Sequence, residues 1–206
     1  MTGAGPHLFW ITSRAAGTAA LVLSSTSVAA GLLIRKRNEP RKLLGGDVKA
    51  LHEALSMATL IALAIHGVTL LGDSYLHPTI LEISVPFSGA YRPFWTGIGI
   101  VGGWGLAALG LSYYARAEIG QARWRSLHRF TALFWALGIA HTLGAGTDAR
   151  QAWFLLVLAV PAIPALILLL GKLIEPATER QRDPRATRPV ASGPRRPDVI
   201  LNGRES

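Results

Sequence analysis

Four histidines stand in two pairs inside apolar stretches of the chain. His52 and His66 have thirteen residues between them, and His128 and His141 have twelve. On helices that rise about 1.5 Å per residue, the two members of a pair would lie roughly 21 Å and 20 Å apart, so two such helices side by side would offer two histidines at each of two depths. Imidazole is a common metal ligand, and two imidazoles at each level make a ligand set for two stacked haems. The pattern predicts a protein that moves electrons across a bilayer.

The angular positions of the histidines support this prediction in part. Fourteen steps of about 100° end some 40° short of four full turns, so His52 and His66 share one face of a helix. Thirteen steps end about 140° short, so His128 and His141 do not share a face of an ideal helix. Tilt, supercoiling or a local bulge near Gly138 would be needed to align them.

The elements that must position these residues are membrane helices. Half of the residues are hydrophobic and only 16% are charged, against roughly 25% in soluble domains. Five apolar segments are long enough to cross a bilayer, where the helix satisfies the backbone groups that lipid cannot. We therefore predict an all-α integral membrane bundle of five transmembrane helices, at residues 10–34, 50–72, 94–115, 127–146 and 151–172.

The distribution of charge predicts the orientation of this bundle. Lys and Arg cluster in residues 35–49 and 114–126 and again from Lys172 onward, whereas the intervening loops 73–93 and 147–150 hold one arginine each. By the positive-inside rule, the N-terminus lies outside and the C-terminus is cytoplasmic. The net charge of +9 follows from these flanking clusters, so it does not indicate a nucleic-acid partner.

The same composition predicts the domain organisation and the compartment. We expect a haem-binding transmembrane domain over residues 1–172, surrounded by membrane lipid in the plasma (inner) membrane, and a disordered basic Pro/Arg-rich cytoplasmic tail over residues 173–206. The chain has no cysteine, which excludes iron–sulfur clusters, thiolate zinc sites and covalently attached c-type haem.

The histidine spacing resembles that of the ferric reductase-like transmembrane domain family. This family includes iron reductases, the membrane half of NADPH oxidases and the haem-binding membrane subunit of the periplasmic methionine sulfoxide reductase system. Its hallmark is a His-x13-His helix and a His-x12/13-His helix separated by one span, as His52/His66 and His128/His141 are here. The resemblance implies two b-type haems (haem b), the inner iron bound by His52 and His128 and the outer iron by His66 and His141.

An arginine extends the resemblance to the first span. The family carries an arginine in the helix before the first histidine pair, and Arg14 matches it. With the N-terminus outside, Arg14 would lie at the depth of the outer haem, where it would pair with a propionate or contact an acceptor. The alternative is an arginine at a helix end whose guanidinium extends to the membrane surface.

The resemblance implies transmembrane electron transfer, with the chain as an oxidoreductase component of the ferric reductase-like kind. Iron reductases and NADPH oxidases continue into flavin and nicotinamide domains, whereas this sequence ends after a short tail. We therefore expect electrons from a separate flavoprotein, a reductase or quinol. The acceptor on the outer face would be ferric iron, oxygen, quinone or a periplasmic enzyme.

Two other functions remain as alternatives. One is a haem-binding membrane anchor subunit of a separate soluble redox enzyme. The other is a non-redox channel or transporter whose histidines relay protons.

Three further patterns have more ordinary interpretations. Residues 97–102 match GxGxxG, but they lie in an apolar span with no strand before them, so we interpret the glycines as a smooth helix face that admits a neighbour or a porphyrin. His7 and His77 lie outside the spans and are interpreted as exposed loop histidines, with a metal site that includes Glu82 as the alternative. Trp135 is interpreted as a packing residue, with a place against a haem as the alternative.

Overall fold

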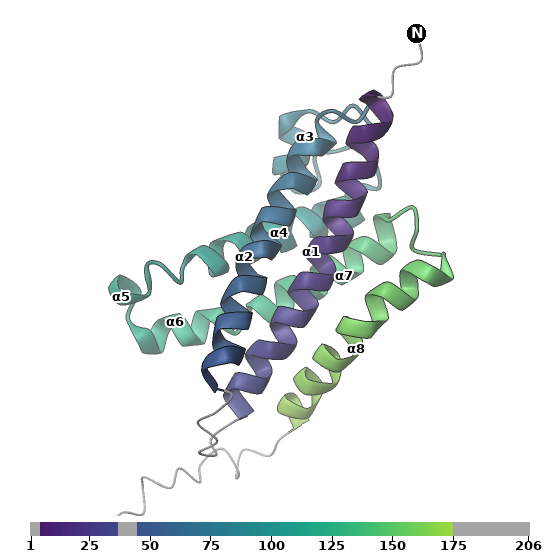
Figure 1. The fold of residues 1–206 in the computed structure, drawn as a ribbon. Coiled ribbons are helices and arrows are strands. Elements are labelled where there is room, and N and C mark those ends of the chain that lie inside the picture. The colour runs from purple at the N-terminus through teal and green to yellow at the C-terminus, as the bar shows by residue number, and fades with distance from the viewer. Residues whose placement is uncertain (1–4, 37–44, 175–206) are drawn as a thin grey trace, which may run out of the picture. The chain divides into compact units, whose positions relative to one another are not determined.

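The described part of the chain is built from helices alone and contains no strand. The computed structural model describes residues 5–36 and 45–174. The bundle belongs to the first of two compact units, residues 1–170, the second being 171–206. The helices in chain order are α1 (Gly5–Lys36), α2 (Gly45–Leu70), α3 (Ile80–Ser84), α4 (Pro93–Leu111), α5 (Arg116–Ile119), α6 (Gln121–His128), α7 (Thr131–Ala145) and α8 (Ala152–Ile174) (Figure 1). The predicted all-α class is confirmed. The predicted tail lies almost wholly outside the described residues.

Four of the five predicted spans are long apolar helices. The segments long and apolar enough to cross a membrane are His7–Ile34, Asp47–Leu70, Pro93–Leu111 and Ala152–Ile174. They lie in α1, α2, α4 and α8. The length of uninterrupted apolar sequence thus identified these helices correctly, although their orientation in a membrane stays a prediction.

The predicted span at residues 127–146 is not one helix. α6 ends at His128 and α7 begins at Thr131, and the chain turns at Arg129 and Phe130. The backbone N–H of Phe130 donates to the Leu127 carbonyl at 3.0 Å, an i→i+3 bond that tightens the end of α6. α7 has 15 residues, which give it a length of about 22 Å against roughly 30 Å of hydrocarbon. The structure therefore does not confirm five spans.

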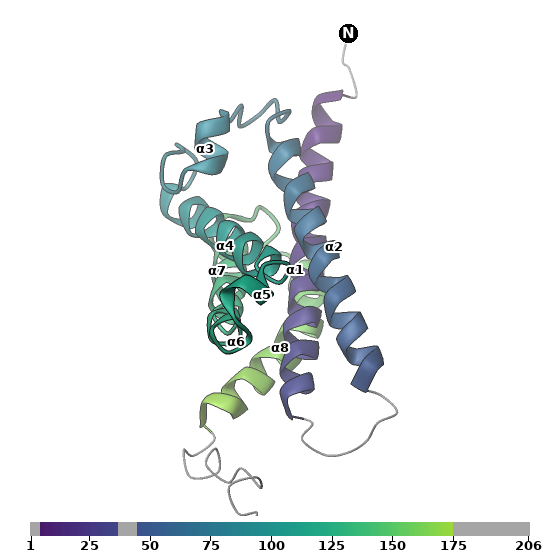
Figure 2. The same ribbon diagram turned by 90° about the vertical axis from the view of Figure 1, so that its left-hand side faces the viewer.

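The unit contains two pairs of adjacent antiparallel helices. α1 lies along α2, and α4 lies along α7 (Figure 1 and Figure 2). The face of α1 toward α2 repeats small residues at alternating steps of four and three, and small side chains let two helix backbones approach closely. These residues are Ser13, Gly17, Ala20, Ser24, Ser27 and Gly31.

The glycines of α4 make a similar approach to α7. A Cβ atom at Gly102 would lie 3.0 Å from the Phe134 carbonyl oxygen and 3.4 Å from the Gly138 nitrogen, so the two backbones are in contact there. The interpretation of residues 97–102 as a smooth helix face is confirmed. α7 is a regular helix through Gly138, and the irregularity between the two histidines lies at residues 129–130 instead.

The centre of the unit is a buried tryptophan. Trp135 is 1% exposed, and its Nε1 donates to the Ser25 hydroxyl at 2.9 Å. Ser25 in turn donates to the Leu21 carbonyl at 2.7 Å, and the Leu21 side chain packs with Phe154 and Leu158 of α8. Trp135 therefore connects α7 to α1 at the point where α1 also meets α8.

Replacing Trp135 with phenylalanine should destabilise the protein. The change removes a buried donor and part of a large ring, which costs about 1–3 kcal/mol, or a melting temperature lower by several degrees. Trp153→Phe is the matched control, because Trp153 is 56% exposed and its indole makes no hydrogen bond in the described residues. Near-ultraviolet circular dichroism during heating in detergent measures both; equal melting temperatures would contradict the central role of Trp135.

Candidate metal-ligating histidine site

The structure brings His52 of α2 and His128 of α6 together. Their ring centroids are 6.1 Å apart and their planes are nearly perpendicular, at 87°. Two imidazoles on opposite sides of one metal ion have centroids about 6 Å apart, because each metal–nitrogen bond is about 2 Å long. The separation of the rings therefore suits a shared metal. His128 is the last residue of α6, before the two residues that separate α6 from α7.

His66 of α2 and His141 of α7 border one large cavity. The cavity has a volume of about 790 Å³ and is lined mostly by apolar side chains and glycines of α1, α2, α4 and α7. Pockets of this size, apolar with a few polar groups, are typical of cofactor sites.

Three of the four imidazoles have the same hydrogen bond. The Nδ1 atom lies 2.9 Å from the Ser27 carbonyl oxygen in His52, 2.8 Å from that of Ser13 in His66, and 2.9 Å from that of Trp95 in His141. A carbonyl oxygen only accepts, so Nδ1 carries the proton and donates it. Nε2 of each ring then keeps its lone pair, which is the state that binds a metal.

Both serines add a second contact to the same ring. The Ser13 hydroxyl lies 3.1 Å from Nδ1 of His66, and the Ser27 hydroxyl lies 3.0 Å from Nδ1 of His52. The two serines are buried, at 2% and 5% exposure. Each ring of α2 is thus fixed in orientation by one residue of α1.

His128 is held in a different way. Its Nδ1 atom is buried and makes no hydrogen bond. The Trp124 ring stacks on the imidazole, with centroids 4.8 Å apart and planes inclined by 25°. Trp124 precedes His128 by one turn of α6, so the stack fixes the plane of the ring where a carbonyl does not.

Glycines make the space for three of the rings. A Cβ atom at Gly17 would lie 3.0 Å from Nδ1 of His66, one at Gly31 would lie 3.1 Å from Cε1 of His52, and one at Gly99 would overlap the His141 ring. Each of these glycines lies four residues after the residue whose carbonyl accepts from the same ring. The pairs are Ser13 and Gly17, Ser27 and Gly31, and Trp95 and Gly99. The Ser-x3-Gly pattern, repeated after fourteen residues in α1, is a signal that analysis of the histidines alone missed.

Arg14 lies on the wall of the cavity together with His66. Its guanidinium forms an ion pair with Asp148 in the turn between α7 and α8, and it lies 4.1 Å from the centroid of the Trp10 ring. Both Arg14 and Asp148 border the cavity. A guanidinium has five donors, so the ion pair leaves some available to an anionic group. Arg14 is predicted from the sequence as a site residue, whereas its acidic partner Asp148 is not.

The residues of the alternative metal site are not brought together. In residues 5–36 and 45–174, no three His, Cys, Asp or Glu side chains gather to hold a metal ion, so His7, His77 and Glu82 do not form a site. Glu82 instead completes a capping box at the start of α3, where its carboxylate accepts from the Thr79 backbone N–H at 2.8 Å. This hydrogen bond lowers the pKa of the Glu82 carboxyl.

No family model, curated protein or solved structure matches the chain. The resemblance to the ferric reductase-like domain therefore stays a prediction that depends on the four histidines and Arg14.

Proposed function

We propose that this chain is a membrane protein that holds two b-type haems through His52 with His128 and His66 with His141, and that it transfers electrons between the two faces of a bilayer. The observation that carries the proposal is the shared orientation of the imidazoles. Nδ1 of His52, His66 and His141 donates to a backbone carbonyl, so the opposite nitrogen is available to a metal.

One observation supports a haem at each level. The 6.1 Å separation of the His52 and His128 rings matches a bis-histidine site, and the cavity of about 790 Å³ beside His66 and His141 has room for a large flat apolar ligand. Arg14, on the same wall, would bind a propionate. Bound haem would supply a reversible one-electron carrier within a layer that otherwise excludes charge.

The chain's own residues would have three tasks. The carbonyls of Ser13, Ser27 and Trp95 keep three imidazoles in the ligating tautomer and raise their basicity. The apolar walls exclude water from the iron. Two histidines at each level leave no open coordination position, which favours electron transfer over binding of oxygen at the metal.

A proton relay is a weaker explanation of the same residues. A relaying imidazole passes a proton in at one nitrogen and out at the other, whereas a backbone carbonyl can accept a hydrogen bond but cannot carry a proton onward. In three of the four rings, one nitrogen donates its hydrogen bond to such a carbonyl. This bonding supports ligation over relay.

An optical spectrum of the purified full chain tests the proposal. We expect a Soret band and, after reduction, a sharp α band that corresponds to two haems per chain. A protein purified with a supply of haem that shows neither band would overturn the proposal and leave the channel or transporter. Reduction of ferric chelates by the haem-loaded protein alone, or only with an added partner, then distinguishes a reductase from a membrane anchor of a soluble redox enzyme.

A further inference from the structure

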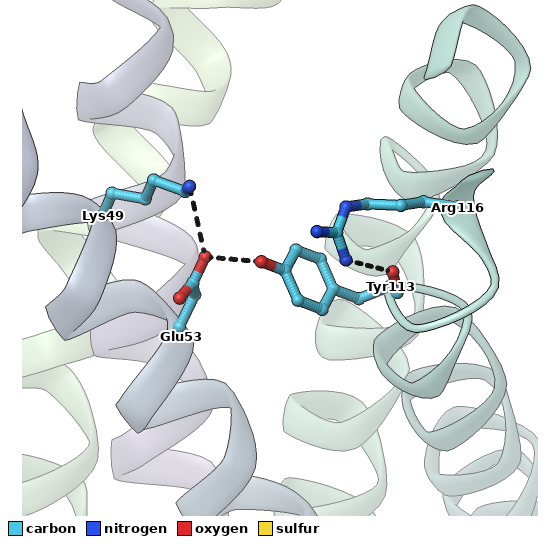
Figure 3. A network of polar contacts seen from close by, with 4 residues as sticks. All are labelled: Lys49, Glu53, Tyr113 and Arg116. Atoms are coloured by element: carbon cyan, nitrogen blue, oxygen red, sulfur yellow. Dashed lines mark hydrogen bonds and ion pairs between the residues drawn. The ribbon is translucent and has the colours of Figure 1, made fainter. Parts of the chain in front are cut away.

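A series of side-chain contacts connects His128 to the residue that follows His52. The Trp124 ring, stacked on His128, donates its Nε1 hydrogen to the Ser112 hydroxyl at 3.2 Å. The edge of Trp124 meets the Tyr113 ring, with centroids 6.0 Å apart. The Tyr113 hydroxyl donates to Glu53 Oε1 at 3.0 Å across the space between α2 and the segment that follows α4, as Figure 3 shows.

Two cations flank the Tyr113–Glu53 hydrogen bond, one on each side. Lys49 Nζ lies 3.7 Å from Glu53 Oε1, one helical turn away on α2. The Arg116 guanidinium lies 3.9 Å from the centroid of the Tyr113 ring and donates to the Tyr113 carbonyl at 2.7 Å. Lys49 and Glu53 are both more than two fifths exposed, so the ion pair adds little stability. Lys49 and the Tyr113 hydroxyl contact the same carboxylate oxygen, Oε1 of Glu53.

The two ligands of this site come from separate parts of the unit. His52 belongs to α2, which packs along α1, and His128 belongs to α6, which follows α4. In the described residues, the bond from Tyr113 to Glu53 is the hydrogen bond that joins α2 to the segment 93–145. The two parts are also joined by the Trp135–Ser25 bond between α7 and α1, but the Tyr113–Glu53 bond lies only one residue away from one of the ligands.

We propose that Tyr113, Glu53 and Trp124 are positioning residues for the His52–His128 haem. Tyr113 and Glu53 set the separation of the two ligands, and Trp124 sets the plane of the one imidazole whose Nδ1 lacks a hydrogen bond. This inference rests on the proposed function and extends it to residues that do not touch the iron. The His66–His141 site has its own hydrogen bonds and is independent of these three residues.

The test is Tyr113→Phe in the full chain, which removes the hydroxyl and keeps the ring. The haem that His128→Ala removes should transfer to apomyoglobin about fivefold faster than in the wild type, as expected for the loss of one hydrogen bond. Its low-spin ferric electron paramagnetic resonance signal should also shift, because the two ligands are held less firmly and the Trp124 ring that fixes the His128 plane contacts Tyr113. The other haem should keep its transfer rate and its signal.

Matched variants separate positioning from a general loss of structure. Tyr114→Phe is the control, because Tyr114 is the adjacent tyrosine, is 65% exposed and has no hydrogen bond to its hydroxyl in the described residues. Trp124→Leu should shift the electron paramagnetic resonance signal of this haem. Trp124→Phe keeps a stacked ring and should shift the signal much less. Glu53→Ala breaks the same bond from the other side, so its effect and that of Tyr113→Phe should not add in the double variant.

The outcomes distinguish the inference from the function on which it rests. Two haems in the wild type, with equal transfer rates and spectra in Tyr113→Phe and Tyr114→Phe, would overturn the positioning role and leave the proposed function intact. Additive effects of Tyr113→Phe and Glu53→Ala would also overturn it. A wild type without haem would overturn the proposed function itself.

Discussion

Replacing His66 with alanine is expected to lower the haem content from two per chain to one, and replacing His141 should remove the same haem. Both imidazoles border one cavity, and a b-type haem that lost one of its two histidine ligands would keep only the other histidine, packing and propionate contacts. The double replacement should therefore remove no more haem than either single one. The pyridine haemochrome assay gives the stoichiometry, and the reduced spectrum at low temperature identifies which haem remains.

His52 and His128 should form the second group of the same experiment. Each alanine variant should lose the other haem, and His52→Ala combined with His66→Ala should lose both. His77→Ala is the control, because His77 lies in the loop between α2 and α3 and belongs to neither pair. If His52→Ala and His66→Ala removed the same haem, or if neither removed any, the assignment of two pairs would be wrong.

Adding a single methyl group at Gly99 should reduce the haem content nearly as much as replacing His66 or His141. A Cβ atom there would overlap the ring of His141, which is also held by the Trp95 carbonyl and cannot turn away without losing that bond. Forcing an extra carbon into such a site costs about 1–3 kcal/mol, and here the ligand itself must move. We expect Gly99→Ala to lose the His66–His141 haem while the His52–His128 haem stays bound.

Gly103→Ala is the matched control for this change. Gly103 lies one turn further along α4, and a Cβ atom there would meet nothing within 4 Å. Both glycines border the cavity, so the two variants differ mainly in the contact with His141. Haem stoichiometry and the melting temperature of each variant check the prediction. Equal haem content in the two variants would show that His141 tolerates displacement and would contradict a fixed ligand at this position.

The histidine spacing was informative because it matches the way these helices pack. His52 and His66 are fourteen residues apart, as are Ser13 and Ser27, which hold their rings. Fourteen residues are two heptads, so positions at this interval return to one face of a packed helix. The pairing of two histidines on α2 with two contacts on α1 is thus a periodicity that a sequence can reveal.

The interval between His128 and His141 was harder to interpret for a local reason. No glycine or proline stands between His128 and Thr131, and the turn there depends on i→i+3 backbone bonds at Leu127 and Phe130. Continuous apolar sequence therefore predicted one span at residues 127–146. The prediction therefore included neither the break between His128 and His141 nor the short helix α7.

By itself the sequence determined the class of the protein: a helical chain whose long apolar segments include the four helices able to cross a membrane, with two pairs of histidines in or beside such segments. These properties depend on consecutive residues and on helical period. The fifth predicted span was not confirmed. Only the tertiary structure decided which groups the histidines meet. The repeated Ser-x3-Gly spacing marks a face of α1, but every residue has the same backbone carbonyl, so the sequence does not show that those of Ser13, Ser27 and Trp95 are the acceptors. The pairs Arg14–Asp148 and Tyr113–Glu53 likewise join distant residues, and the register of packed helices brings them into contact.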